Sequence, residues 1–129
     1  MQSLLFRVNG LPAPQGSKRH VGGGRMIEAS KKVGPWREAV KEAVSLLSFT
    51  PFDGPLFIDI QFFVQKPKTV KRERPTVPPD LDKLVRGLFD ALTIANVWMD
   101  DALVVEVTAS KSYSTEDEEP GCIVFIKNL

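Results

Sequence analysis

Residues 79–101 constrain this chain most, because one helix there would satisfy both the apolar spacing and the acidic spacing. The apolar residues recur at the intervals of an amphipathic helix: Leu81, Leu84, Val85, Leu88, Phe89 and Leu92. Asp80 and Asp82 stand at its start, and Asp100 and Asp101 follow its end. Clustered carboxylates repel one another unless a cation neutralises them, and hard oxygen ligands suit Mg²⁺ or Mn²⁺. The pattern therefore predicts a divalent-metal site.

The same acids have a purely structural interpretation. Asp80 suits a helix N-cap, Asp82 favours the positive end of the helix dipole, and acidic pairs such as the one at 100–101 are common in turns. In mid-helix, Asp80 and Asp82 would diverge by roughly 200°. An N-cap residue is not yet helical, so the two carboxylates can converge on one ion, which Asp101 would reach from the following strand.

Composition indicates one soluble globular domain. The chain has 129 residues, of which 43% are hydrophobic, enough for a core without cross-links. Its one cysteine, Cys122, excludes an internal disulfide and fits a reducing compartment. The N-terminus does not resemble a signal peptide, and no apolar run approaches the length of a membrane span. We therefore expect a cytoplasmic protein that does not enter a membrane.

The net charge of +1 conceals an asymmetry along the chain. Residues 1–79 contain 13 Lys and Arg against 6 Asp and Glu, whereas residues 80–129 contain 4 against 10. This division suggests a polyanionic partner and an acidic centre. The irregular segment 66–79 is the most basic part, with one acid, Glu73, among Lys66, Lys68, Lys71, Arg72 and Arg74. Such runs are usually solvated loops, but this one leads directly to Asp80 and could guide phosphates there.

The remaining pattern predicts the order of the elements. We expect strand 4–8, an irregular Gly- and Pro-rich segment 10–25, a brief strand 26–27, helix 35–48, strand 56–65, the acidic helix, and strands 102–110 and 121–127 paired as a hairpin. The segment 10–25 contains Lys18, Arg19 and His20, the last of which we interpret as a solvated histidine. This order predicts a single α/β (α+β) domain with a mixed sheet and two main helices.

Two runs in the acidic half, D-L-D-K-L-V-R-G-L-F-D-A-L and V-W-M-D-D-A-L-V-V-E, resemble the RusA family of Holliday junction resolvases. The segments S-K-R and W-R-E-A-V agree in order, as does Lys111 in V-T-A-S-K. The resemblance covers nearly the whole chain and implies a single RusA-like endonuclease domain over residues 1–129. It also implies a homodimeric, Mg²⁺-dependent endonuclease, with Mn²⁺ able to substitute, that nicks four-way DNA junctions symmetrically. Members are often encoded by phages.

The resemblance also assigns roles to residues. The catalytic, metal-binding carboxylates of the family match Asp80, Asp82 and Asp101, and its functional lysine matches Arg86. Arginine can stabilise developing negative charge but cannot readily lose a proton. Without such a role, Arg86 would form an i, i+4 salt-bridge ladder with Asp82 and Asp90. The expected phosphate-contacting cations are Lys18, Arg19, Lys66, Lys68, Lys71, Arg72, Arg74, Lys83 and Lys111.

Two other functions fit the same residues. One is a less selective Mg²⁺ nuclease that cuts flaps or branched DNA, and the other is a junction-binding protein that has lost catalysis at Arg86. Resolution of a junction requires two matched cuts, and each chain offers one acidic cluster. A two-fold homodimer would supply two equivalent sites at a fixed separation.

Overall fold

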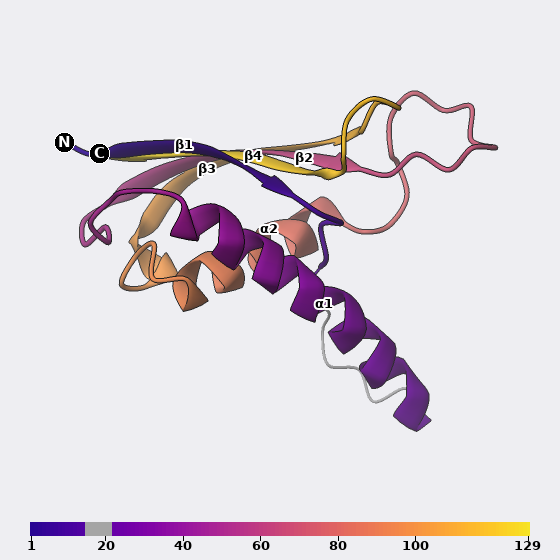
Figure 1. Cartoon of the computed structure of the whole chain (residues 1–129), viewed down its shortest axis with the longest axis horizontal. Helices are drawn as coiled ribbons and strands as arrows, with labels where there is room; N and C mark the ends of the chain where they lie inside the picture. Colours follow the sequence, from indigo (N-terminus) through magenta and orange to yellow (C-terminus); the bar gives the residue numbers. More distant parts are fainter. Residues whose placement is uncertain (15–21) are drawn as a thin grey trace.

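A computed structural model describes residues 1–14 and 22–129, and the side chains of residues 1–14 and 31–129. The elements are β1 (Ser3–Asn9), α1 (Gly22–Ser45), β2 (Leu56–Val64), α2 (Leu81–Ile94), the 3-10 helix η1 (Asp101–Leu103), β3 (Val104–Tyr113) and β4 (Gly121–Asn128). The strands form one sheet in the order β1-β4-β2-β3, and both α-helices lie on the same face of it (Figure 1). The predicted class, a single α+β domain with a mixed sheet and two main helices, is confirmed.

The pairing of the last strand differs from the prediction. β4 lies antiparallel between β1 and β2, so the predicted hairpin with β3 is wrong. β3 instead runs parallel to β2 at the sheet edge, and α2 makes the crossover that a parallel pair requires. The physical reason is burial: Cys122, Val124 and Ile126 are fully buried and need a central strand. No side chain of β3 is fully buried, which suits an edge.

The predicted strand 56–65 forms as β2, and its side chains alternate between buried and more exposed positions. Leu56, Ile58, Ile60 and Phe62 are each 0% exposed and face the helices, because alternate side chains of a strand point to the same face. The intervening side chains, starting with Phe57, face the other side of the sheet, where no helix of the described chain lies (Figure 1). Cys122 belongs to the buried core, and burial raises the pKa of its thiol.

The first helix is longer than predicted. α1 begins at Gly22 rather than at Pro35, so it includes residues 26–27, where the predicted strand is wrong, and it shortens the predicted irregular segment. Proline inside a helix removes a hydrogen bond and costs about 3 kcal/mol, so the sequence alone predicts a helix that starts at Pro35. The part of α1 after Pro35 packs on the sheet through Trp36, Val40 and Val44, whereas its first half extends past the sheet (Figure 1).

α2 follows the predicted apolar stripe. Leu84, Leu88 and Leu92 are each 0% exposed and belong to the core that α2 shares with α1 and the sheet. After the helix, Asp100 Oδ1 accepts a hydrogen bond from the backbone N–H of Ala102 at 2.8 Å and caps η1. The following strand therefore begins at residue 104, two residues later than predicted, and continues to residue 113. These junctions bring acidic residues to both ends of α2.

Candidate functional site

The N-terminus of α2 presents two exposed carboxylates. Asp80 occupies the N-cap with an extended backbone, but its side chain makes no capping hydrogen bond. It lies 3.8 Å from the Lys83 ammonium, measured from Oδ2 to Nζ, and remains more than half exposed. Asp82 lies exposed in the first turn, where the helix dipole favours a negative charge. The position of Asp80 therefore agrees with a cap, whereas its carboxylate is free of the bond that a cap would make.

Lys111 fixes the chain immediately before these acids. Its Nζ donates hydrogen bonds to the carbonyl oxygens of Val77 and Pro79, each at 2.9 Å. Lys111 reaches them from β3, so the edge strand holds the connection that leads to Asp80. An ammonium has three N–H donors, and two of them are engaged here. Lys111 is therefore placed to orient the backbone next to Asp80, a contact that the sequence did not reveal.

A second acidic group lies at the other end of α2. It consists of Asp90 on the helix, Asp100 and Asp101. Partial burial, the charges of Asp100 and Asp90, and a side-chain hydrogen bond with Asp100 raise the pKa of Asp101 above its ordinary value. A raised carboxyl pKa of this origin means that the charged form gains from a nearby cation. The participation of Asp90 was missed, because its helical spacing from Arg86 suggested a salt bridge instead.

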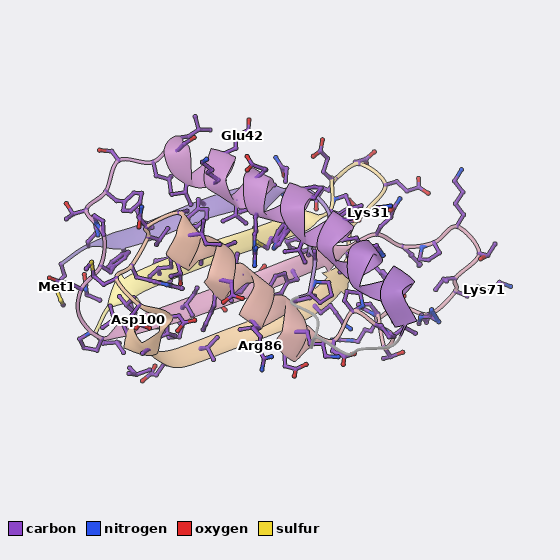
Figure 2. The ribbon with its side chains drawn as sticks, turned by 90° about the horizontal axis from the view of Figure 1, so that it is seen from below. Met1, Lys31, Glu42, Lys71, Arg86 and Asp100 are labelled. Atoms are coloured by element: carbon purple, nitrogen blue, oxygen red, sulfur yellow. The ribbon has the colours of Figure 1, made fainter. Side chains whose placement is uncertain are left out.

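Arg86 lies between the two acidic groups. Asp82 and Asp90 are eight residues apart on α2, a separation of about 12 Å along the helix axis, and Arg86 is one turn from each. Among the side chains that the structure describes, no ion pair within 4.0 Å joins Arg86 to either acid, so the predicted ladder is not formed. Figure 2 shows Arg86 near the start of α2 and Asp100 toward its other end.

These groups contain the oxygen donors that Mg²⁺ prefers, but they are not gathered around one point. In the described part of the chain, no three acidic, histidine or cysteine side chains are close enough together to hold a metal ion. The neighbours that raise the pKa of Asp101 are Asp100 and Asp90 rather than Asp80 and Asp82. The convergence of Asp80, Asp82 and Asp101 on one ion therefore stays a prediction.

The basic segment projects beyond the sheet from the end of β2 (Figure 1). All five of its cations are exposed, and Lys71 lies near its tip (Figure 2). Tyr113, the last residue of β3, is in contact with two of them. The Lys66 ammonium lies 5.7 Å from the centroid of its ring, and Arg72 Nε donates to its hydroxyl at 2.9 Å. Sequence reasoning missed Tyr113, because nothing in the chain marks the end of β3 as the support of this segment.

The cations predicted near the N-terminus lie outside the residues that the structure describes. Lys18, Arg19 and His20 fall within residues 15–21, which are not among the described residues. Their predicted contacts with phosphate stay predictions. Lys83, another predicted phosphate ligand, is paired with Asp80.

Comparison with known proteins decides the family. Residues 9–127 match the family described as "Endodeoxyribonuclease RusA". The chain belongs to the RusA family. A relative from Bacillus subtilis (strain 168), "Uncharacterized protein YqaN", is 32% identical over 146 residues, and the alignment covers 100% of this chain and 99% of the relative. The RusA assignment confirms the predicted family, fold class and enzyme class, an endodeoxyribonuclease. No helix in the described part of this RusA-family chain is long and apolar enough to cross a membrane.

Proposed function

We propose that this chain is a Mg²⁺-dependent endonuclease that resolves four-way (Holliday) DNA junctions by paired, symmetric nicks. The observation that carries the proposal is the arrangement along α2. A basic segment leads to exposed carboxylates at its start, Arg86 follows without an ion-pair partner among the described side chains, and a second acidic group lies beyond it. Cations that attract phosphates therefore lie next to carboxylates that can hold a metal. Membership of an endodeoxyribonuclease family supports the same reaction.

The proposed roles follow the chemistry of each side chain. Asp80, Asp82 and Asp101 are the proposed ligands of Mg²⁺, for which Mn²⁺ can substitute. A bound divalent ion supplies an activated water and neutralises charge on the phosphodiester. Arg86 stabilises charge on the phosphate oxygens, a task that needs a permanent cation and no proton transfer. The expected products have 5′-phosphate and 3′-hydroxyl ends.

The DNA backbone is held by cations around this centre. The proposed contacts are Lys18, Arg19, the cations of the 66–74 segment, Lys83 and Lys111. Such contacts position the duplex arms without reading their sequence. Lys111 acts in addition on the protein itself, since it already holds the carbonyl of Pro79 beside Asp80. The proposed setting is the cytoplasm of a bacterium or of a phage-infected host.

Paired nicks require two copies of this centre. The sheet face opposite the helices is the surface that we assign to the second copy. It exposes Leu5 (69% exposed) and carries Phe57 and Phe125, whose ring centroids lie 6.4 Å apart. A sheet face with several apolar side chains and no covering element is a typical interaction surface.

Charge complementarity supports self-association through that face. Arg7 on β1 lies over the ring of Phe63, and Lys127 on β4 lies over the ring of Phe57. Asp59 on β2 and Glu106 on β3 belong to the same face, because Glu106 pairs with Phe57. In a two-fold contact, each residue of one copy contacts the same partner residue on the other copy as the other copy's residue contacts on the first. The cations of one copy can therefore contact the acids of the other.

The proposal is tested with labelled four-way, flap and linear duplex DNA in Mg²⁺ or in chelator. Paired nicks in the four-way DNA alone support resolution. Cutting of all three substrates indicates a general nuclease, and tight binding without cutting in Mg²⁺ and Mn²⁺ indicates a binding protein. Asp101→Asn should reduce cutting by a factor on the order of 10² or more while binding persists, since several kcal/mol of metal assistance is lost. Exposed Asp53 in the loop before β2 provides the matched control, Asp53→Asn.

A further inference from the structure

The connection between α2 and η1, residues 95–100, begins with a tightly closed helix end. Val97 N–H donates to the carbonyl oxygen of Leu92 at 3.1 Å, and Asn96 N–H donates to that of Thr93 at 3.1 Å. Asn96 has a φ of 60°, the left-handed conformation that this pair of hydrogen bonds requires and that asparagine tolerates. The chain therefore leaves α2 in one defined direction.

The side chains of Trp98 and Thr93 close this connection against the helix. Trp98 is 2% exposed, and its Nε1 donates a hydrogen bond to Thr93 Oγ1 at 2.7 Å. Thr93 Oγ1 uses its own proton to donate to the carbonyl oxygen of Phe89 at 2.8 Å, so toward the indole it acts as an acceptor. The rings of Phe89 and Trp98 make a T-shaped contact with centroids 5.4 Å apart. Because a buried donor needs its acceptor, this hydrogen bond fixes the orientation of the indole.

The buried residue Phe52, in the loop before β2, holds the backbone of the same connection. Its N–H donates to the carbonyl oxygen of Val97 at 2.9 Å, and its own carbonyl oxygen accepts from Met99 N–H at 3.1 Å. These two bonds flank Trp98 and form an isolated parallel bridge between Phe52 and Trp98. The backbone is therefore fixed up to Met99, the residue before Asp100.

The acidic pair of the proposed catalytic centre begins where this fixed backbone ends. Asp100 accepts from Ala102 N–H at 2.8 Å, and Asp101 lies between them in the chain. Asp90, the other member of this acidic group, lies on α2 three residues before Thr93. Thr93 therefore links the connection that carries Asp101 to the helix that carries Asp90.

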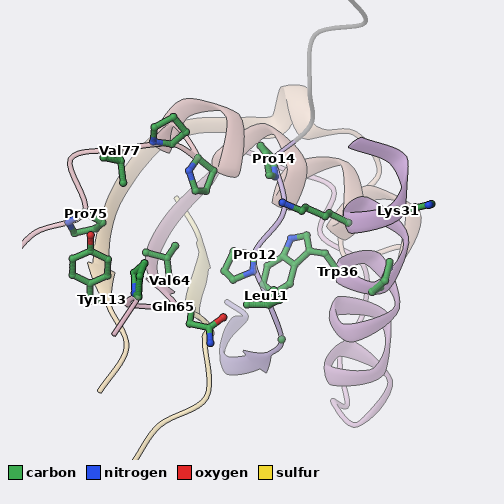
Figure 3. A pocket seen from close by; sticks show the side chains of 16 residues that line it. Leu11, Pro12, Pro14, Lys31, Trp36, Val64, Gln65, Pro75, Val77 and Tyr113 are labelled. Atoms are coloured by element: carbon green, nitrogen blue, oxygen red, sulfur yellow. The ribbon is translucent and has the colours of Figure 1, made fainter. Parts of the chain in front are cut away.

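The start of α2 is held by different residues. There Lys111 donates to the carbonyl oxygen of Pro79 at 2.9 Å, beside a cleft of about 730 Å³ in which Val77 and Trp36 lie on opposite sides (Figure 3). Lys111 belongs to β3, whereas Thr93 belongs to α2 itself. A change at Thr93 should therefore leave the start of the helix in place.

We propose that Thr93 and Trp98 are positioning residues, whose hydrogen bond sets where Asp101 lies in the catalytic centre. The inference rests on the proposed function, in which Asp101 takes part in cutting. Groups that take part in catalysis must be held within about 0.5 Å of their productive positions. Thr93 and Trp98 act on the reaction through the backbone that leads to Asp101.

Two substitutions at Thr93 separate its hydroxyl from its shape. Thr93→Val removes the acceptor and keeps the size of the side chain, whereas Thr93→Ser keeps the hydroxyl. In ¹⁵N-labelled protein without metal, the backbone amide signals of Asp100 and Asp101 should shift in Thr93→Val and return toward wild-type positions in Thr93→Ser. The amide signal of Asp80 should stay in place in both. Unmoved Asp100 and Asp101 signals in Thr93→Val overturn the inference.

Junction cutting gives the second measurement. Thr93→Val should lower kcat and the affinity for Mn²⁺ by roughly tenfold each, the lower end of the effect of residues that orient metal ligands. Junction affinity in chelator should stay at the wild-type value, and Thr93→Ser should restore kcat. Val44→Ala, at a buried position on α1, is the control for lost stability: it should melt at a lower temperature and keep the wild-type kcat while folded.

Trp98→Phe removes the same hydrogen bond from the donor side and keeps an aromatic ring, so it decides the question if Thr93→Val does not fold. The double variant should lose no more kcat than either single variant, because there is one bond to lose, and losses that multiply contradict the inference. If wild type resolves junctions and both single variants keep its kcat, the inference fails and the proposed function stands. If wild type neither cuts nor binds junctions, the proposed function fails and the inference fails with it.

Discussion

At the scale of single residues, Asp101 gives the clearest dependence on pH. Its raised pKa means that the folded state binds the proton more tightly than the unfolded state. Its contribution to stability is therefore present at low pH and is lost as pH rises through the raised pKa. We expect Asp101→Asn to remove this loss, so the melting temperature of wild type relative to the variant should fall as the pH rises from below the ordinary pKa of 3.8 through the raised value. Thermal melts of both proteins across this range test the prediction, and an unchanged difference would contradict it.

Lys111 is the second residue whose neighbours give a prediction. Lys111→Met keeps the apolar stem but removes the donors to Val77 and Pro79. Hydrogen bonds from a charged donor are worth about 1.5–3 kcal/mol, so we expect the free energy of unfolding to fall by about 2 kcal/mol. Because these bonds hold the backbone next to Asp80, kcat should fall more than junction affinity. Lys41→Met, at an exposed lysine on α1, is the control and should leave kcat unchanged.

Asp101→Asn and Lys111→Met thus separate two effects at one site. The first changes the charge that a metal would neutralise, whereas the second changes how firmly a neighbouring carboxylate is held. A raised Mg²⁺ concentration should restore activity to Lys111→Met more than to Asp101→Asn, since metal can compensate for weaker positioning of its ligands.

At the scale of elements, the basic segment should determine how binding responds to salt. Lys68, Lys71 and Arg74 are exposed on this segment between β2 and α2. Each phosphate contact contributes about 0.9 to the slope of log K against log salt concentration. Replacing all three with Ala should therefore reduce the slope by roughly 2 to 3, as measured by titration of a catalytically inactive variant. Replacing Lys41, exposed on α1, is the control. An unaltered slope in the triple variant would remove this segment from the DNA interface.

α1 shows why element boundaries were harder to predict than element types. Pro35 and the glycines at 22–24 are poor helix residues, yet the helix continues through all of them. The helix after Pro35 was predicted, because the buried residues Trp36, Val40 and Val44 recur in the sequence at helical spacing. The part of the helix before Pro35 has no comparable apolar period from which it could be predicted.

At the scale of the whole molecule, the uncovered sheet face should control oligomeric state. Phe125→Glu places a negative charge among the apolar side chains of that face, beside Phe57. We expect the variant to be monomeric by light scattering at concentrations where wild type is a dimer, and to make unpaired nicks. Leu46→Glu, at an exposed position just after α1 (83% exposed), should remain a dimer. A dimer that survives Phe125→Glu would place the interface elsewhere.

The sequence by itself determined what depends on local period and on a specific motif. The stripe of α2, the alternation of β2 and the spacing of the acids could be predicted, because helix and strand repeats of 3.6 and 2 residues are local properties. The acidic motifs were also enough to identify the resemblance to the RusA family.

Only the tertiary structure decided which strands are neighbours and which side chains meet. β4 lies between β1 and β2 in the sheet. Which strands occupy central positions depends on how much apolar surface each strand buries in the complete sheet, and no single segment of the sequence contains that information. The hydrogen bonds of Lys111 to Pro79 and of Arg72 to Tyr113 join elements whose relative placement no local pattern encodes. The same holds for the charge of Asp90, which raises the pKa of Asp101. The buried nitrogen of Trp36 is the same kind of property, since the sequence gives the donor and only the packed chain shows that none of the described residues accepts from it.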